Sequence, residues 1–250
     1  MSRDRLNCGK ALLAVTAALL CVPVAIGQSS QHRTSLLDLK LGTAVSELPE
    51  EAFIDYACGT NGGPPGRMLG SFEDFTLCAA ETSGLHEVTF RYDDELEYLA
   101  LARGDLNGAE INGGTTIANY PVYASALFDH AGILRGLRAV TDERAELRQR
   151  TNAYLMPDFI WNLFGREGWD CVDRDAAGGK EPLAGRYVNR SCTKTTDGML
   201  IYTEAHLFRK AGQTEINRST GRLNRGQFDS SARLDIREAG APADSAGKPL

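Results

Sequence analysis

The central part of the chain alternates apolar and polar residues with a period of two, which is typical of antiparallel strands with one buried face. Val88, Phe90 and Tyr92 share one face of the first such segment, and the acidic residues 93–95 are expected to form the turn after it. Residues 104–116 are rich in glycine and polar side chains and predict an exposed loop. The pattern predicts strands at 86–92, 96–101, 121–128, 133–140, 199–208 and 213–217, with a further candidate at 227–237.

Apolar residues three or four positions apart predict two helical stretches, one before each group of strands. The first covers residues 44–57, where Thr43 or Ser46 can cap the start. The second covers residues 142–164, which Pro157 is expected to break or kink. Helices segregated from antiparallel strands predict an α+β fold, with helices packed on one face of an antiparallel β-sheet.

The first 27 residues have the pattern of a secretory signal peptide. Three basic residues precede an apolar run at 11–26, and the small residues Ala25 and Gly27 suit signal peptidase. We therefore expect a secreted or periplasmic protein, with a buried N-terminal helix or an uncleaved anchor as the alternative. The rest of the chain has no apolar run of membrane-spanning length, so no transmembrane span is predicted in the mature chain.

Composition and charge narrow the class of partner. The chain has 250 residues, of which 42% are hydrophobic, so it can bury a sizeable core. Removal of residues 1–27 takes away three basic residues and one acidic residue, and changes the formal net charge from −6 to about −8. An acidic protein is repelled by nucleic acid and anionic lipid. The basic group Arg218, Arg222 and Arg225 has no interleaved aromatic residues, so we expect no nucleic-acid partner.

Four cysteines remain in the predicted mature chain: Cys58, Cys78, Cys171 and Cys192. An even number in an oxidising compartment predicts two disulfides, and four cysteines allow three pairings. The spacing favours the two local pairs, because these are separated by 20 and 21 residues. Zinc-type and CxxC spacings are absent, so we expect the cysteines to be structural.

The predicted elements around the two cysteine pairs follow each other in the same order. This order suggests an internal duplication, and chance spacing of the cysteines is the alternative. Each pair follows a helix-like stretch, encloses a loop with glycine and proline, and precedes β-rich sequence. The expected layout is a signal peptide at 1–27, a polar arm at 28–40, a first α+β repeat at 41–118, a second α+β repeat with a linking hairpin at 119–238, and a disordered tail at 239–250.

The stretch LGTAVSEL at 41–48, Cys58, the glycine-rich loop, Cys78 and the strand after it together resemble one repeat of the beta-lactamase inhibitor proteins. A related unit of a helix followed by strands occurs in small outer-membrane assembly lipoproteins. The resemblance covers residues 41–102 and, more loosely, residues 142–217. It implies a secreted tandem-repeat protein with one disulfide in each repeat. It is a resemblance of architecture and assigns no inhibitory residue.

No motif in the chain assigns a catalytic, metal or cofactor site. The Gly-x-Ser-x-Gly, HExxH and phosphate-loop patterns do not occur. The leading hypothesis is therefore a non-catalytic protein that binds another exported protein or an envelope component. Candidate contact residues are the aromatics Trp161, Trp169, Tyr120 and Tyr123, for which core packing is the alternative.

The sequence is also compatible with two other functions. An exported hydrolase could assemble its site from dispersed residues such as His86 with Asp93 or Glu95. A cation- or small-ligand-binding module could use the carboxylates clustered in residues 93–97 and 105–110, because hard cations prefer oxygen ligands.

Overall fold

The structure is a computed structural model that describes residues 34–176, 180–210, 220 and 228–239. The predicted signal peptide, the strand at 213–217 and the three arginines at 218–225 lie outside the described residues. Within the described ranges, every helix is too short or too polar to cross a bilayer.

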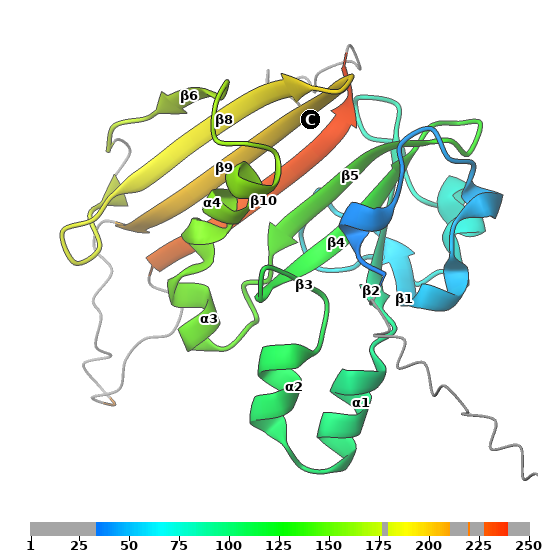
Figure 1. The fold of residues 1–250 in the computed structure, drawn as a ribbon, viewed down its shortest axis with the longest axis horizontal. Coiled ribbons are helices and arrows are strands. Elements are labelled where there is room, and N and C mark those ends of the chain that lie inside the picture. The colour runs from blue at the N-terminus through cyan, green and yellow to red at the C-terminus, as the bar shows by residue number, and fades with distance from the viewer. Residues whose placement is uncertain (1–33, 177–179, 211–219, 221–227, 240–250) are drawn as a thin grey trace, which may run out of the picture. The chain divides into compact units, whose positions relative to one another are not determined.

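In the described residues, ten strands form one antiparallel sheet (Figure 1). Eight of these follow the order β1-β2-β4-β5-β10-β9-β8-β6, while β3 pairs with β4 and β7 pairs with β9. The strands are β1 (Phe53–Cys58), β2 (His86–Tyr92), β3 (Thr116–Ile117), β4 (Tyr120–Phe128), β5 (Leu134–Thr141), β6 (Asp170–Asp173), β7 (Lys180–Glu181), β8 (Val188–Thr196), β9 (Met199–Lys210) and β10 (Phe228–Glu238).

The helical segments are short, so the protein is mainly an antiparallel β-sheet with a few helices. They are η1 (Leu36–Asp38), η2 (Val45–Glu47), η3 (Glu50–Ala52), η4 (Phe72–Leu77), α1 (Glu95–Ala102), α2 (Leu106–Asn112), α3 (Leu147–Thr151), η5 (Ala153–Leu155) and α4 (Met156–Leu163). The segment 36–52 and α4 lie over one face of the sheet, and α1 and α2 form a helical hairpin beyond the end of β2 (Figure 1).

The hydrophobic core lies on the sheet face that the segment 36–52 and α4 cover. The predicted inward face of β2 is confirmed, since Val88, Phe90 and Tyr92 are all buried. The ring of Phe72 packs edge-on against Phe90, with 5.1 Å between the ring centroids.

The opposite face of the sheet is polar, yet it is also covered. The glycine-rich loop that follows β1 crosses it, and the Glu87 carboxylate accepts hydrogen bonds from the backbone N–H groups of Asn61 (2.6 Å) and Gly62 (3.2 Å). A Cβ atom at position 62 would lie 2.2 Å from Cγ2 of Val140, and φ is +81° there. Only glycine therefore allows the loop to lie this close to the sheet.

Residues 44–57 do not form the predicted helix. Two 3₁₀ turns lead instead into β1, which contains a bulge where Asp55 has φ of +54°. The bulge places Phe53 and Tyr56 on the same side of the strand, and both rings pack against Phe72. A strand irregularity thus produces the three-residue spacing that resembled a helix.

The predicted return strand at 96–101 and the predicted loop at 104–116 are also wrong, because these residues form α1 and α2. The Asp94 carboxylate accepts from the backbone N–H of Glu97 (3.3 Å), and that of Asp105 accepts from Gly108 (2.8 Å). Each helix therefore begins at an acidic cap, which local spacing of apolar residues did not reveal.

The segment 142–164 is helical only in parts. It contains α3, η5 and α4, and Pro157 stands in the first turn of α4, where a missing N–H costs little. The remaining strand predictions are confirmed: β2, the β4–β5 hairpin, β9 and β10 match the expected ranges within two residues.

The polar arm ends earlier than residue 40. Leu36 is fully buried and Leu39 is nearly so, because leucines at this spacing reach the core from η1. The predicted boundary at 118–119 falls in the turn between β3 and β4, and the sheet is continuous on both sides of it.

Both disulfides follow the pairing that the spacing favoured. Cys58–Cys78 joins the end of β1 to the residue after η4, and Cys171–Cys192 joins directly paired residues of β6 and β8. The elements around the two bridges therefore differ, and the internal duplication stays a prediction without support from the element order.

Candidate ligand-binding site

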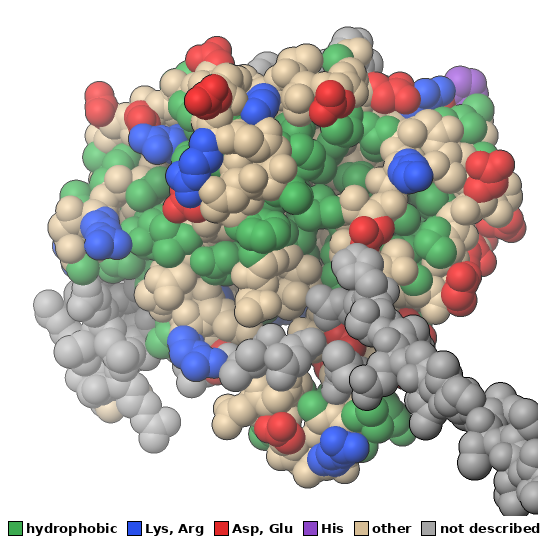
Figure 2. Space-filling model, viewed as in Figure 1, with side chains coloured by type: hydrophobic (Ala, Val, Ile, Leu, Met, Phe, Trp, Pro, Cys, Tyr) green, Lys and Arg blue, Asp and Glu red, His purple; other side chains and the backbone are tan. Residues whose placement is uncertain are grey.

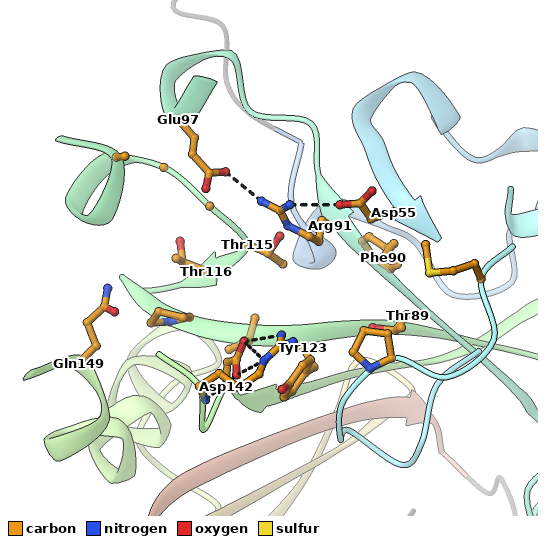
Figure 3. A pocket seen from close by; sticks show the side chains of 18 residues that line it. Asp55, Thr89, Phe90, Arg91, Glu97, Thr115, Thr116, Tyr123, Asp142 and Gln149 are labelled. Carbon is orange, nitrogen blue, oxygen red and sulfur yellow. Dashed lines mark hydrogen bonds and ion pairs between the residues drawn. The ribbon is translucent and has the colours of Figure 1, made fainter. Parts of the chain in front are cut away.

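A cavity of about 650 Å³ opens where β2 and β4 meet the α1–α2 hairpin and the segment after β5 (Figure 3). We call it the polar cavity. Eighteen residues from these elements, from β1 and from the loop after β1 line it. The side chains that carry charge are Asp55, Arg91, Glu97, Asp142 and Arg144.

One wall is built around Arg91, which lies between two carboxylates (Figure 3). Its guanidinium nitrogens are 3.1 Å from Oδ2 of Asp55 and 3.3 Å from Oε2 of Glu97. The positive φ of Asp55 in the β1 bulge turns this carboxylate out of the usual strand alternation. The irregular strand that misled the sequence prediction therefore supplies a group of the site.

The facing wall is built around Asp142, Arg144 and Tyr123. The Asp142 carboxylate accepts hydrogen bonds from the backbone N–H of Arg144 (2.8 Å) and from its Nη2 (2.8 Å). Burial opposes ionisation of Asp142, but these hydrogen bonds outweigh burial and lower its pKa. The Arg144 guanidinium carbon also lies 4.8 Å from the centre of the Tyr123 ring, a cation–π distance.

Tyr123 is buried at the boundary between this cavity and a second hollow of about 400 Å³. Burial first, and the Asp142 carboxylate second, raise the pKa of its phenol, so the hydroxyl stays protonated. The Tyr123 hydroxyl lies beside the Asp142 carboxylate, and this contact helps to lower the pKa of Asp142.

The backbone holds the cavity open. At Gly113, a Cβ atom would lie 2.5 Å from Cβ of Glu97, so a larger residue would push the two helices apart. The Thr115 hydroxyl accepts from the backbone N–H of Tyr92 (3.0 Å), which fixes the segment after α2 to the end of β2. The site is thus formed by packing that does not depend on a ligand.

The ionised groups of the polar cavity do not balance. Three carboxylates stand against two guanidinium groups, which leaves one net negative charge. Groups of three or more histidine, cysteine or acidic side chains that could hold a metal ion are missing from the described part of the chain. The net negative charge of the lining is suited to a cationic group.

The structure disperses the four aromatic residues that the sequence suggested as contacts. Tyr123 lines the polar cavity, whereas Tyr120 lies at the start of β4, where burial and then Asp158 raise its pKa. Trp161 and Trp169 lie together near the end of α4, with 6.0 Å between ring centroids. The charged residues of the cavity were missed because they come from four separate segments with no common spacing.

The dispersed catalytic set is not assembled. His86 begins β2 and Asp93 follows its end, so about 20 Å of strand separates them at roughly 3.3 Å per residue. The His86 ring instead lies 2.8 Å, through Nδ1, from the carbonyl oxygen of Cys78.

The chain was compared with family models, curated proteins and solved structures. It matches no family model, no curated protein and no solved structure. The resemblance to the beta-lactamase inhibitor proteins thus stays a prediction.

Proposed function

We infer that this is a non-catalytic binding protein of an extracytoplasmic, oxidising compartment, and that the polar cavity accepts a basic side chain of another exported protein. The observation that carries the proposal is the unbalanced charge of a preformed cavity: Asp55, Glu97 and Asp142 against Arg91 and Arg144.

Each part of the site supports recognition of a basic group. Arg91 is already flanked by two carboxylates, so an approaching cation meets a net negative wall. The Asp142 carboxylate on the facing wall is ionised, since its hydrogen bonds lower its pKa, and it adds a third negative charge to the cavity. The net negative charge of the whole chain also attracts a basic partner.

The two disulfides support the proposed compartment. Disulfides of this kind persist in secreted and periplasmic proteins and are rare in the reducing cytosol. The predicted signal peptide agrees with the same location, which makes an exported protein or an envelope component the natural partner.

A titration with blocked tripeptides tests the proposal. Peptides that differ only in a central lysine, arginine, norleucine or glutamate are added to the labelled protein, and amide shifts are followed by NMR. We expect saturable shifts around the polar cavity with lysine or arginine and none with the other two. Equal binding of the norleucine peptide would overturn the proposal.

Charge variants of the cavity give a second test. Asp55→Asn and Glu97→Gln should each weaken binding of the basic peptide by roughly two- to fivefold, since a partly exposed ion pair contributes about 0.5–1 kcal/mol. Asp173→Asn removes a carboxylate from an exposed ion pair on β6, far from the cavity, and is the matched control. If the control variant weakens peptide binding equally, the effect is due to the net charge of the protein and not to the polar cavity.

A further inference from the structure

A third cavity, on the opposite side of the sheet from the polar face, has a different chemistry. It has a volume of about 570 Å³ and opens between the segment 37–41 and the end of α4. We call it the apolar cavity. Hydrophobic side chains gather across the middle of this face (Figure 2). The cavity is lined by Leu37, Leu39, Leu41, Leu137, Leu163, Phe164, Met199 and Ile236, with Lys40, Asp197, Gly198 and Glu238 among them.

The floor of the apolar cavity is the hydrophobic core itself. Leu137 on β5 and Ile236 on β10 are buried, and both belong to the core cluster. Leu163, at the end of α4, is 53% exposed although it lines the cavity wall. An apolar ligand that covered these side chains would remove them from water and would be stabilised by the hydrophobic effect.

Separate hydrogen bonds hold each wall of the apolar cavity in place. The backbone N–H of Gly42 donates to the Leu134 carbonyl (2.8 Å) and holds the segment 37–41 to β5. The N–H of Ala239 donates to the Gly198 carbonyl (2.7 Å) and fixes the β8–β9 turn. The Lys194 ammonium donates to the Phe164 carbonyl (2.6 Å) and fixes the end of α4.

The polar residues of the lining carry opposite charges. Glu238 is engaged by Arg135, whose Nη1 lies 3.0 Å from its carboxylate. Lys40 and Asp197 are both exposed, and no ion pair joins either of them to another residue in the described part of the chain. One cationic and one anionic side chain thus remain available at the mouth of an apolar hollow.

We propose that the apolar cavity binds a single-chain zwitterionic amphiphile of the lysophospholipid class. The acyl chain would lie on Leu137 and Ile236, and the phosphate and ammonium of the headgroup would face Lys40 and Asp197. A methylene group and a water molecule each occupy about 30 Å³, so the volume holds roughly one chain of sixteen to eighteen carbons and leaves no room for two.

Direct binding tests the proposal. Palmitoyl lysophosphatidylethanolamine is titrated into the purified protein below its critical micelle concentration and followed by calorimetry. We expect one site with a micromolar dissociation constant, and no binding of phosphoethanolamine, which lacks the chain. Absence of binding by the lysolipid would overturn the proposal. Association only with vesicles of intact two-chain phospholipid would assign the contact to a bilayer surface and would also overturn it.

A filling variant locates the acyl chain. Leu163→Trp places a large ring at the cavity wall and should weaken lysolipid binding at least tenfold. Leu77→Trp changes a leucine of similar exposure, 49%, on η4 outside the cavity, and should leave binding unchanged. Both sites are partly exposed, so both variants are expected to fold, and their melting temperatures verify this. Equal affinity of the two variants would place the chain elsewhere.

Headgroup selectivity tests the two charges. Asp197→Asn keeps a residue that tolerates the positive φ of +49° at this turn, and should shift the preference towards palmitate, which carries only a negative charge. Lys40→Gln should shift it towards hexadecyltrimethylammonium, which carries only a positive charge. We expect each shift to be about threefold or more in relative affinity. Unchanged preferences in both variants would contradict the headgroup assignment.

Discussion

Two buried arginines on the polar face of the sheet differ in their partners. Arg138 on β5 has Glu81, Glu87 and Asp235 at 2.5, 3.0 and 2.8 Å. Burial opposes its charge, but these carboxylates outweigh burial and raise its pKa. Arg237 on β10 is equally buried, and its guanidinium nitrogens have no hydrogen-bond partner among the described residues. Burial lowers the pKa of Arg237 to about 10.

Replacement of each arginine by methionine should therefore act in opposite directions. Arg138→Met leaves Glu81 and Glu87 without their cation, while Asp235 keeps Arg233, and should lower the free energy of unfolding by about 3–5 kcal/mol. Arg237→Met removes an uncompensated buried charge and should leave stability unchanged or raise it by about 1–2 kcal/mol. Urea denaturation measures both. A large loss in Arg237→Met would contradict the assignment of Arg237 as an uncompensated buried charge.

Tyr56 makes stability sensitive to alkaline pH. Burial first, and Glu50 and Glu51 second, raise the pKa of its phenol to about 12, and the hydroxyl donates to the Glu50 carbonyl (2.9 Å). The folded state thus holds this proton more tightly than the unfolded state, in which the pKa is about 10. The stabilisation is complete below pH 10 and is lost as pH rises towards 12.

Between pH 8 and pH 11 the wild-type protein should lose about 1 kcal/mol more than the Tyr56→Phe variant, because phenylalanine cannot ionise. Denaturant titrations at the two pH values measure the difference. Tyr202 and Tyr123 also have raised pKa values, so the variant should retain part of the alkaline loss. Parallel pH profiles for the two proteins would contradict the assignment to Tyr56.

At the scale of elements, the β1 bulge links the core to the polar cavity. It turns Phe53 and Tyr56 inward and the Asp55 carboxylate towards Arg91. The left-handed backbone at Asp55 is open to glycine and asparagine but is strained for a β-branched residue.

The effect of substitutions at Asp55 on stability should depend on how well the new residue adopts a left-handed backbone, and not on its size. Asp55→Gly and Asp55→Asn should change the free energy of unfolding by less than about 0.5 kcal/mol, since the carboxylate is half-exposed and its ion pair is weak. Asp55→Val should cost about 1–2 kcal/mol. Thermal denaturation of the three variants checks the order, and equal stability of the valine and asparagine variants would argue against strain at the bulge.

For the whole molecule, the two disulfides have unequal structural consequences. Cys58–Cys78 closes the loop that carries Asn61 and Gly62 across the polar face. Cys171–Cys192 ties down β6, an edge strand whose four residues are all exposed. Loss of the first bridge therefore disturbs both layers over the sheet, whereas loss of the second can be absorbed by separation of β6 alone.

Paired cysteine-to-alanine variants test this difference. Removal of Cys58–Cys78 should lower the free energy of global unfolding by about 3 kcal/mol, the chain-entropy cost for a loop of about 20 residues. Removal of Cys171–Cys192 should cost less globally and should raise hydrogen exchange in β6 first. Equal global losses, with no local exchange in β6, would contradict the comparison.

Local chemistry in the sequence determined several features of this protein. Strict alternation predicted β2 and the β4–β5 hairpin, and equal spacing predicted the cysteine pairs, because these features depend on residues near each other in the chain. Tertiary structure decided the rest. It made a bulged strand of residues 53–58 through pairing with β2, and it gathered the charged groups of the polar cavity from separate elements. Those outcomes depend on packing between distant segments, which the pattern along one segment does not encode.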